Sequence, residues 1–264
     1  MSKINIYTEK EIGILKEGGK ILSSILNQIK DETLENVSTK SLDKKAYDLC
    51  LENKAIPAFL NYTPHGADRA FPATMCISVN HEVVHGIPNE KPRILKKGDV
   101  VTLDMGLKYK DMFTDSAITL VVGGGEYNKI GQEMIDVATK ALYKAIDIVK
   151  PGIRTGDIGQ AIEDTVKNNK GNKFKIPTIL GGHGIGYAVH EDPFIPNFGK
   201  KNEGVLLKEG MVIAIEPILT EKSTAMNQLS DGYTFVTQDK GLAVHVEHTV
   251  VVTKDGCEIL TGGL

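Results

Sequence analysis

Four carboxylates occur inside runs of residues that would otherwise form buried β-strands. They are Asp104 in VVTLDMG, Asp115 in FTDSAITLVV, Glu216 in MVIAIEP and Glu247 in LAVHVEHTVVV. An ionised carboxylate is costly to bury unless an opposite charge, a raised pKa or a metal ion compensates for the lost water. Ion pairs with Lys or Arg would be the simplest solution for any one of these acids. The cores of these strands, however, contain neither residue.

A pair of divalent cations would serve all four acids together if their strands are neighbours. Two such ions would offset the four negative charges, and a histidine could complete the ligand set. Oxygen-rich ligation with one imidazole favours Co²⁺, Mn²⁺ or Fe²⁺, and Zn²⁺ also fits. A two-metal site can activate water and polarise a carbonyl group. The acids therefore predict hydrolytic chemistry.

The spacing of the acids predicts how the strands hold them. A turn at Lys110-Asp111 separates Asp104 from Asp115, so a hairpin is expected to bring these two opposite each other. In the predicted strand 242–253, successive side chains point to opposite faces. One face carries Ala243, His245, Glu247 and Thr249, and His248 lies on the other.

Three of the seven histidines are candidates for the site: His85 in VVHGIP, His183 in GGHGIG and His190 in VHEDP. Glycine follows His85 and surrounds His183, and glycine allows close approach of backbone or ligand. The remaining four are interpreted as ordinary surface or core residues: His65, His81, His245 and His248. A phosphate loop is disfavoured for GGHGIG, which lacks the lysine of GxxxxGK(S/T) and is not followed by a helix.

His183 and His190 are seven residues apart, so a straight strand would turn them to opposite faces. They can serve one site only if the chain bends between them. The bend is expected at Gly184 and Gly186, and an unbroken strand from 183 to 190 would contradict the assignment.

The remaining pattern predicts two halves, each with two helices followed by strands. A capping box of Thr8 and Glu11 opens a helix over 8–29, and the other helices are expected from the Ser/Thr cluster at 38–41 to 52, over 127–149 and over 155–171. The predicted strands are MCISVN, GDVVTLDMGLKY, DMFTDSAITLVVGG, KFKIPTIL, GMVIAIEP, YTFVTQD and LAVHVEHTVVVT. A weak internal duplication and the lack of a linker indicate one fused α+β domain over 1–264, with halves 1–124 and 125–264.

Composition is ordinary for a soluble globular protein. The 264 residues are 41% hydrophobic and 25% charged, and the net charge of −3 gives no general attraction to nucleic acid or an anionic membrane. No apolar run approaches the roughly 20 residues of a membrane span, and the first residues lack a signal-peptide pattern, so a cytoplasmic location is expected. The cysteines Cys50, Cys76 and Cys257 are odd in number and form no CxxC pair, which favours reduced thiols.

Seven motifs occur in a familiar order: CISVNHEVVHGIP, VVTLDMG, TDSA, GGHGIG, HEDP, AIEP and VEHTVVVTKDGCEIL. Over nearly its whole length the sequence resembles the bacterial type I methionine aminopeptidases, which are pita-bread (creatinase-like) metallopeptidases. The resemblance implies an α+β fold with pseudo-two-fold halves around a curved antiparallel sheet. It also implies removal of the initiator methionine from nascent proteins and peptides, a preference for a small second residue, two divalent metal ions and a monomer. The ribosome is a further partner to consider.

The resemblance also implies roles for individual residues. The five metal ligands would be Asp104, Asp115, His183, Glu216 and Glu247, with Asp115 and Glu247 bridging the two ions. Glu216 would also help to deprotonate the attacking water.

His85 and His190 would face the substrate amide and carbonyl. Phe71 and Cys76 align with the methionine pocket, and Phe59 and Tyr233 are expected as further walls.

The segment AFLNYTPHGADRAFPATMC departs from the family pattern. It is longer than usual, and Thr74 stands where serine is common. The extra residues PHGADR could line the mouth of the pocket and bring His65 near the substrate. A solvent loop is the favoured alternative.

Two other functions are alternatives for this sequence. An Xaa-Pro aminopeptidase or dipeptidase could use the same fold. A non-catalytic pita-bread protein could bind nucleic acid or ribosomes, but all five ligand positions are kept here and a basic tail is missing.

Overall fold

The computed structural model describes residues 4–64, 66–169 and 173–264. In these residues the chain runs α1 (Glu9–Glu32), α2 (Thr39–Glu52), β1 (Ile56–Pro57), β2 (Cys76–Val79), β3 (Glu82–Val84), β4 (Val100–Tyr109), β5 (Met112–Val121), the 3₁₀ turn η1 (Gly125–Tyr127), α3 (Lys129–Ile146) and α4 (Thr155–Lys167). It continues with β6 (Gly181–Gly184), β7 (Glu191–Pro196), β8 (Val212–Ile215), β9 (Ile218–Thr220), β10 (Met226–Gln228), β11 (Phe235–Thr237), β12 (Ala243–His245), β13 (Glu247–Val252) and β14 (Cys257–Ile259).

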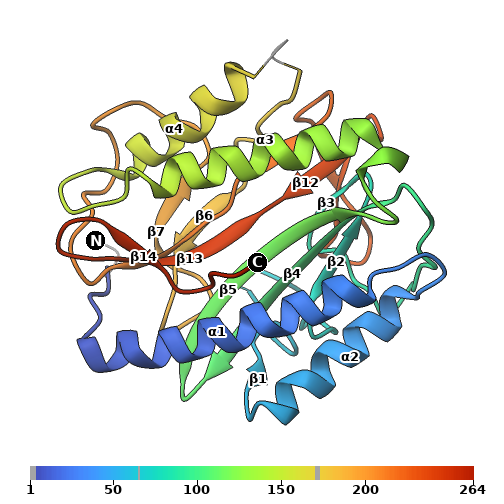
Figure 1. Cartoon of the computed structure of the whole chain (residues 1–264), viewed down its shortest axis with the longest axis horizontal. Helices are drawn as coiled ribbons and strands as arrows, with labels where there is room; N and C mark the ends of the chain where they lie inside the picture. Colours follow the sequence, from blue (N-terminus) through green and yellow to red (C-terminus); the bar gives the residue numbers. More distant parts are fainter. Residues whose placement is uncertain (1–3, 65, 170–172) are drawn as a thin grey trace.

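The order of elements repeats as the sequence predicts, with a helix pair followed by strands in each half (Figure 1). The boundary at 124/125 and the description as one duplicated domain stay predictions.

The helices start where local sequence signals place them, and their ends differ from the predictions by a few residues. The predicted capping box opens α1: the backbone N–H of Thr8 donates to Glu11 at 2.8 Å, and Thr8 accepts from the backbone N–H of Glu11. This helix runs past residue 29 to Glu32, where the Thr33 hydroxyl donates to the carbonyl of Ile29 at 2.7 Å. Both α3 and α4 are shorter than predicted, because η1 takes the start of the predicted 127–149 helix and α4 ends at Lys167.

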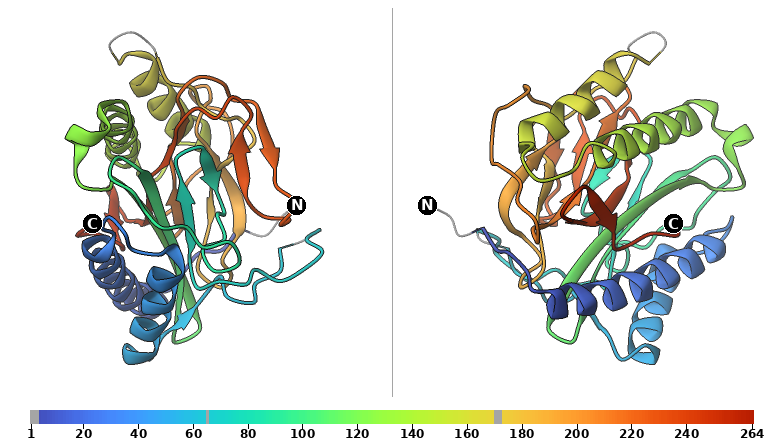
Figure 2. Two further views of the ribbon diagram at one scale, coloured as in Figure 1. Left: turned by 90° about the vertical axis from the view of Figure 1, so that its right-hand side faces the viewer. Right: turned by 60° about the vertical axis from the view of Figure 1, so that its left-hand side comes forward.

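The strands form a curved antiparallel sheet. Its order is β1-β4-β5-β13-β8-β6-β7, with β2 also paired to β4 and β14 to β13. Smaller sheets β10-β11-β3 and β12-β9 lie beside it. Helices α1 and α3 lie along one face of the large sheet, with α2 and α4 packed next to them (Figures 1 and 2).

The side chains of β4 alternate between the face of the sheet that packs against the helices and the opposite face. Val101, Leu103, Met105 and Leu107 pack with α1 and α2 in one hydrophobic core. A second core joins α3 and α4 to the strands of the other half. The intervening positions of β4, among them Asp104, must therefore lie on the face away from the helices.

Three strand predictions need correction. The segment KFKIPTIL forms no strand in its described residues beyond a single bridge from Lys175 to Thr220, and Pro177 cannot donate to a sheet ladder. The predicted strand 242–253 is two strands, β12 and β13, which separate at Val246. Asp104 does not lie directly opposite Asp115, because Asp104 pairs with Ala117 and Asp115 pairs with Gly106.

Among the described residues, none of the helices has the length and apolar character needed to span a membrane.

Two glycines of α1 test the packing of this helix against the end of the chain. A Cβ on Gly19 would overlap the carbonyl of Leu260, whereas a Cβ on Gly13 would meet no atom within 4 Å. We expect Gly19→Ala to lower the free energy of unfolding by about 1–3 kcal/mol through overpacking. The control Gly13→Ala should raise it by about 0.5–1 kcal/mol, because alanine loses less backbone entropy in a helix. Urea unfolding measures both, and equal effects would contradict the close contact.

Candidate active site and metal centre

One cavity collects every side chain that the sequence singled out for the site. It holds about 130 Å³ of space. Its lining includes the predicted residues Phe59, Phe71, Cys76, His85, Asp104, Asp115, His183, His190, Glu216, Tyr233 and Glu247. Tyr62, Pro64, Val84 and His245 also line it.

The β4–β5 hairpin holds the two aspartates. Its turn is at Lys110 and Asp111, which have φ values of 46° and 64°, and the register joins Gly106 to Asp115 and Asp104 to Ala117. Asp104 and Asp115 are therefore diagonal neighbours on one face, and the expectation that they lie directly opposite is wrong. The two-residue turn sets this register.

Strand β13 adds Glu247 to the same row. Ala117 pairs with Asp104 on one side and with Glu247 on the other, so the small Ala117 side chain lies between the two acids. The hydroxyl of Thr249 accepts the N–H of Asp115 at 3.0 Å and donates to its carbonyl at 2.7 Å. This double contact fixes the backbone of Asp115 against β13.

His183 lies at an irregularity between β6 and β7, where the register shifts between Gly182 and Gly184. Its Nδ1 lies 2.9 Å from the carbonyl oxygen of Gly184. A carbonyl oxygen only accepts, so Nδ1 carries a proton, and Nε2 is the nitrogen left free to ligate a metal ion. That free nitrogen is 3.9 Å from Oε1 of Glu216.

The predicted bend between His183 and His190 is present. Strand β6 ends at Gly184, Gly186 has a φ of 147°, and β7 begins at Glu191. The chain thus returns on itself, and the two imidazole centroids are 4.5 Å apart.

Glu191 and the residues before α1 stabilise this bend. One Glu191 oxygen accepts two backbone N–H groups of the turn, at 2.7 and 2.8 Å. The other accepts from Asn5 and from the Tyr7 hydroxyl, both at 2.7 Å. The Tyr7 ring fills the space that a Cβ at Gly186 would need. The position of His190 therefore depends on a contact from the far end of the sequence.

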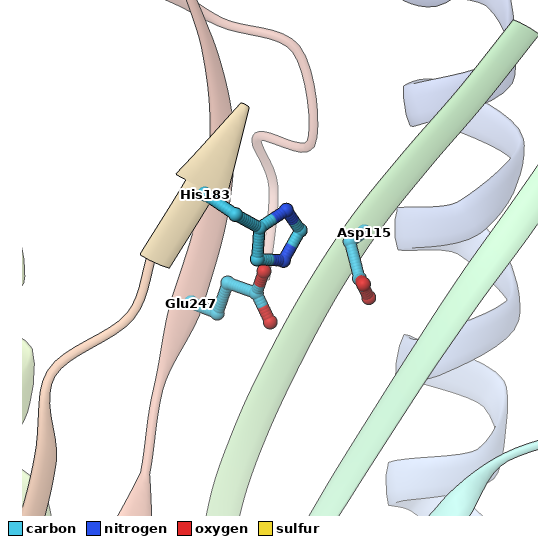
Figure 3. A group of neighbouring side chains, drawn as sticks. All are labelled: Asp115, His183 and Glu247. Atoms are coloured by element: carbon cyan, nitrogen blue, oxygen red, sulfur yellow. The ribbon is translucent and has the colours of Figure 1, made fainter. Parts of the chain in front are cut away.

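Three of the predicted ligands converge on one point. Asp115, His183 and Glu247 each offer a ligand atom, and these atoms all lie within 4.8 Å of one another (Figure 3). All three side chains are buried. Asp104 and Glu216 are outside this group but line the same cavity.

In the described residues, neither Lys nor Arg compensates for the burial of the acids. In the described part of the chain, no Lys or Arg forms an ion pair with any of the four, so the alternative of four separate ion pairs is not supported. Burial raises the pKa of Asp104 to about 7 and that of Glu247 to about 8. Burial, together with the charges of Glu247 and Asp104, raises the pKa of Asp115 well above its usual range.

Two carboxylate oxygens in this group lack a hydrogen-bond partner within the described residues: Oδ1 of Asp115 and Oε1 of Glu247. Buried oxygens without a partner are rare in folded proteins and require an explanation. A cluster of carboxylate oxygens with one unprotonated imidazole nitrogen is the donor set that divalent transition metals take. The residues therefore fit a metal centre.

His245 belongs to the site, although the sequence predicts an ordinary surface or core residue at this position. Its Nε2 lies 3.2 Å from Oε2 of Glu216 and 3.5 Å from Oε2 of Glu247. The sequence contained a signal for this role, because strand alternation places His245 on the same face as Glu247. Burial would raise the pKa of Glu216, but its contact with His245 and the charges of His245 and His183 outweigh burial and lower it.

His85 lies at the opposite wall in a left-handed backbone conformation, with a φ of 60°. The next residue, Gly86, approaches β2 so closely that a Cβ would overlap the carbonyl of Ile77. Burial lowers the pKa of His85 to about 4, so its ring is neutral at pH 7. Burial, and then the charge of His183, lowers the pKa of His190 below its usual value.

An aromatic pocket adjoins the acids. Phe71 makes edge-on contacts with Phe59 and Tyr233, at centroid distances of 6.4 and 5.1 Å. Cys76 pairs with Asp104 across β2 and β4, which connects the pocket floor to the acid cluster. Val189 belongs to this apolar cluster but was not predicted.

The extra residues of the longer segment begin after Tyr62. His65, one of them, lies outside the described residues. Pro64 lines the cavity, and Gly66 to Arg69 line a neighbouring hollow that also contacts His85 and Tyr233.

The comparisons with known proteins agree with this geometry. The model of metallopeptidase family M24 matches residues 13–254. The methionine aminopeptidase of Aquifex aeolicus is 41% identical over an alignment of 264 positions, which covers 98% of this chain and 98% of that one. The crystal structure of methionine aminopeptidase from Rickettsia prowazekii superposes with a TM-score of 0.90 at 36% identity, covering 98% of this chain and all of that chain, 100%.

A prolidase from Pyrococcus furiosus is more distant. It is 25% identical with a TM-score of 0.74, and this chain covers 66% of its length. The pita-bread fold and the enzyme class predicted from the seven motifs are thus confirmed. The chain belongs to metallopeptidase family M24 and, within it, to the methionine aminopeptidases.

Proposed function

We propose that this aminopeptidase removes the initiator methionine from nascent proteins and peptides with two divalent ions. The ions would be bound by Asp104, Asp115, His183, Glu216 and Glu247. The observation that carries the proposal is the convergence of these side chains on one cavity whose other end is apolar, without a Lys or Arg partner in the described residues.

The ions, when bound, would activate water and polarise the scissile carbonyl. Glu216 would accept the proton of the attacking water, since its contacts with His245 and His183 keep its carboxylate ionised. His190 would donate an N–H to the carbonyl oxygen as that oxygen gains charge, and a donor of this kind is typically worth about 3 kcal/mol in the transition state. His85, neutral and on the other wall, would contact the amide.

The apolar end of the cavity suits a methionine side chain. Phe59, Phe71, Cys76 and Tyr233 surround it. Methionine is unbranched and makes favourable contacts between its sulfur and aromatic rings. The cavity of about 130 Å³ is similar in size to an engineered apolar cavity of about 150 Å³ that accepts benzene.

The proposal also covers the identity of the metal ions, the cellular location and the partners. Co²⁺, Mn²⁺ and Fe²⁺ all match the donor set, and Zn²⁺ also fits. The substrates would be new chains in the cytoplasm, and the enzyme would act as a monomer at or near the ribosome, without binding nucleic acid or a membrane.

The metal assignment predicts that Asp115→Asn weakens metal binding at least tenfold, because it removes one negative charge from the ligand set while keeping the side-chain shape. Calorimetric titration of the metal-free protein with Mn²⁺ should give two ions per wild-type chain. Asp111→Asn is the matched control: this exposed acid is in the turn of the same hairpin and forms an ion pair with Lys108 at 2.9 Å. Equal Mn²⁺ affinity in Asp115→Asn and the wild type would contradict the assignment, and one ion per wild-type chain would contradict the two-ion part.

The substrate assignment predicts fast release of methionine from Met-Ala-Ser. Ala-Ala-Ser should be cleaved roughly 10- to 100-fold less efficiently, because it leaves the apolar pocket unfilled. Met-Phe-Ser should also be poorer, because its second residue is large. A Gly-Pro peptide tests the Xaa-Pro alternative, and faster turnover of that peptide would favour it. The kinetics should be measured with Mn²⁺, Co²⁺, Zn²⁺ and, under anaerobic conditions, Fe²⁺. Failure to cleave any peptide with any of these ions would overturn the proposal.

A further inference from the structure

A tyrosine at the mouth of the cavity contacts the proposed oxyanion donor. The hydroxyl of Tyr62 lies 3.0 Å from Nδ1 of His190, and the two ring centroids are 5.6 Å apart. Tyr62 was not among the residues singled out in the sequence. It stands within the longer segment AFLNYTPHGADRAFPATMC, two residues before the extra residues PHGADR.

Backbone contacts fix Tyr62 independently of the tip of that segment. Its N–H donates to the carbonyl of Phe59 at 2.9 Å, and its own carbonyl accepts from the N–H of Phe71 at 2.8 Å. The N–H of Asn61 donates to the carbonyl of Phe71 at 2.9 Å. The segment between Tyr62 and Phe71 is thus a loop closed at its base, and extra residues within it need not displace either ring.

A second set of contacts anchors the far side of the loop. Arg69 makes two 2.8 Å hydrogen bonds to Glu90 and a third, at 3.1 Å, to the carbonyl of Asp231. The Tyr233 hydroxyl donates to the carbonyl of Arg69 and lies 3.5 Å from the carbonyl of Tyr62. The same tyrosine that forms a wall of the pocket therefore connects both sides of the loop.

The hydrogen bond between Tyr62 and His190 has a preferred direction. Burial raises the pKa of Tyr62, so the hydroxyl keeps its proton. Within the described residues, Nδ1 of His190 is the atom found within hydrogen-bond distance of that hydroxyl, and the hydroxyl proton can be donated to it. In a neutral imidazole whose Nδ1 accepts, the ring proton is on Nε2. The N–H then stands on the edge of the ring away from Tyr62.

We propose that Tyr62 is a positioning residue, whose hydroxyl holds His190 in the Nε2–H tautomer and in the orientation that lets it donate to the substrate oxygen. The inference rests on the proposed role of His190. Tyr62 itself does not touch the reacting atoms. The longer segment therefore supports the orientation of His190 through the hydrogen-bonded base of its loop, at Tyr62 and Phe71.

The test is Tyr62→Phe, which removes the hydroxyl and keeps the ring as a pocket wall. Because the pair is partly open to water, we expect kcat for Met-Ala-Ser to fall roughly two- to tenfold, with KM little changed. In the metal-free protein, the ¹⁵N resonances of His190 should show a proton on Nε2 in the wild type. The Nδ1 resonance should shift in Tyr62→Phe, and its assignment follows from its loss in His190→Gln.

Tyr143→Phe is the matched control. It also removes a tyrosine hydroxyl that contacts a histidine, at 3.3 Å from Nε2 of His248, but on α3 at the helix-covered face. It should leave kcat unchanged. Circular dichroism and Mn²⁺ titration establish that each variant is folded and binds metal like the wild type.

The possible outcomes test the role of Tyr62 separately from the proposed aminopeptidase function. A proton on Nδ1 of His190 in the wild type, or an unmoved Nδ1 resonance in Tyr62→Phe, would overturn the hydrogen bond, whether or not the enzyme cleaves methionine. A shifted resonance with unchanged kcat would overturn the positioning role. A rise in KM with unchanged kcat would make Tyr62 a pocket wall only. If the wild type cleaves no peptide, the proposed function fails, and the resonances still decide whether the contact exists.

Discussion

The burial of four carboxylates without a Lys or Arg partner in the described residues is the constraint on which the site depends. Each acid alone would be unstable in the core, and together they also repel one another. The fold accepts this cost on one face of a sheet whose other face is packed against helices. The small Ala117 separates Asp104 from Glu247, and Thr249 fixes the backbone of Asp115. A protein that only needed stability would fill these positions with apolar residues, so the arrangement indicates a binding site for cations and agrees with membership of a metallopeptidase family.

Close backbone approach brings the histidines to these acids. His183 is in a strand irregularity between glycines, and the chain then turns through Gly186, where the Tyr7 ring occupies the space of a side chain. Gly86 plays the same part beside His85, since its backbone touches β2. A Cβ at Gly86 would overlap the carbonyl of Ile77, and a Cβ at Gly186 would overlap the Tyr7 ring. These positions explain why the glycine-containing motifs accompany the histidines in the sequence.

The acid cluster and the substrate pocket differ in how they are built. Asp104, Asp115 and Glu247 come from paired strands, and Glu216 directly follows β8. The pocket walls come in part from the loop that starts at Tyr62, and its base is closed by hydrogen bonds to Phe71. Insertions between these two residues leave both rings in place. The chain can therefore vary at the mouth of its pocket while the acids and histidines keep one geometry.

Much of the fold and most of the site were determined by local sequence. Periodicity and the Thr8 capping box placed the helices, and unpaired acids in apolar strands pointed to a metal centre, because burial cost is a property of the residue itself. Two of the misses have local causes. The diagonal relation of Asp104 to Asp115 follows from the register that the two-residue turn sets, and Pro177 within KFKIPTIL cannot donate to a sheet ladder. Only the tertiary structure turned His245 from an ordinary core residue into a neighbour of two acids, since its partner Glu216 comes from another strand and sequence spacing carries no information about such contacts.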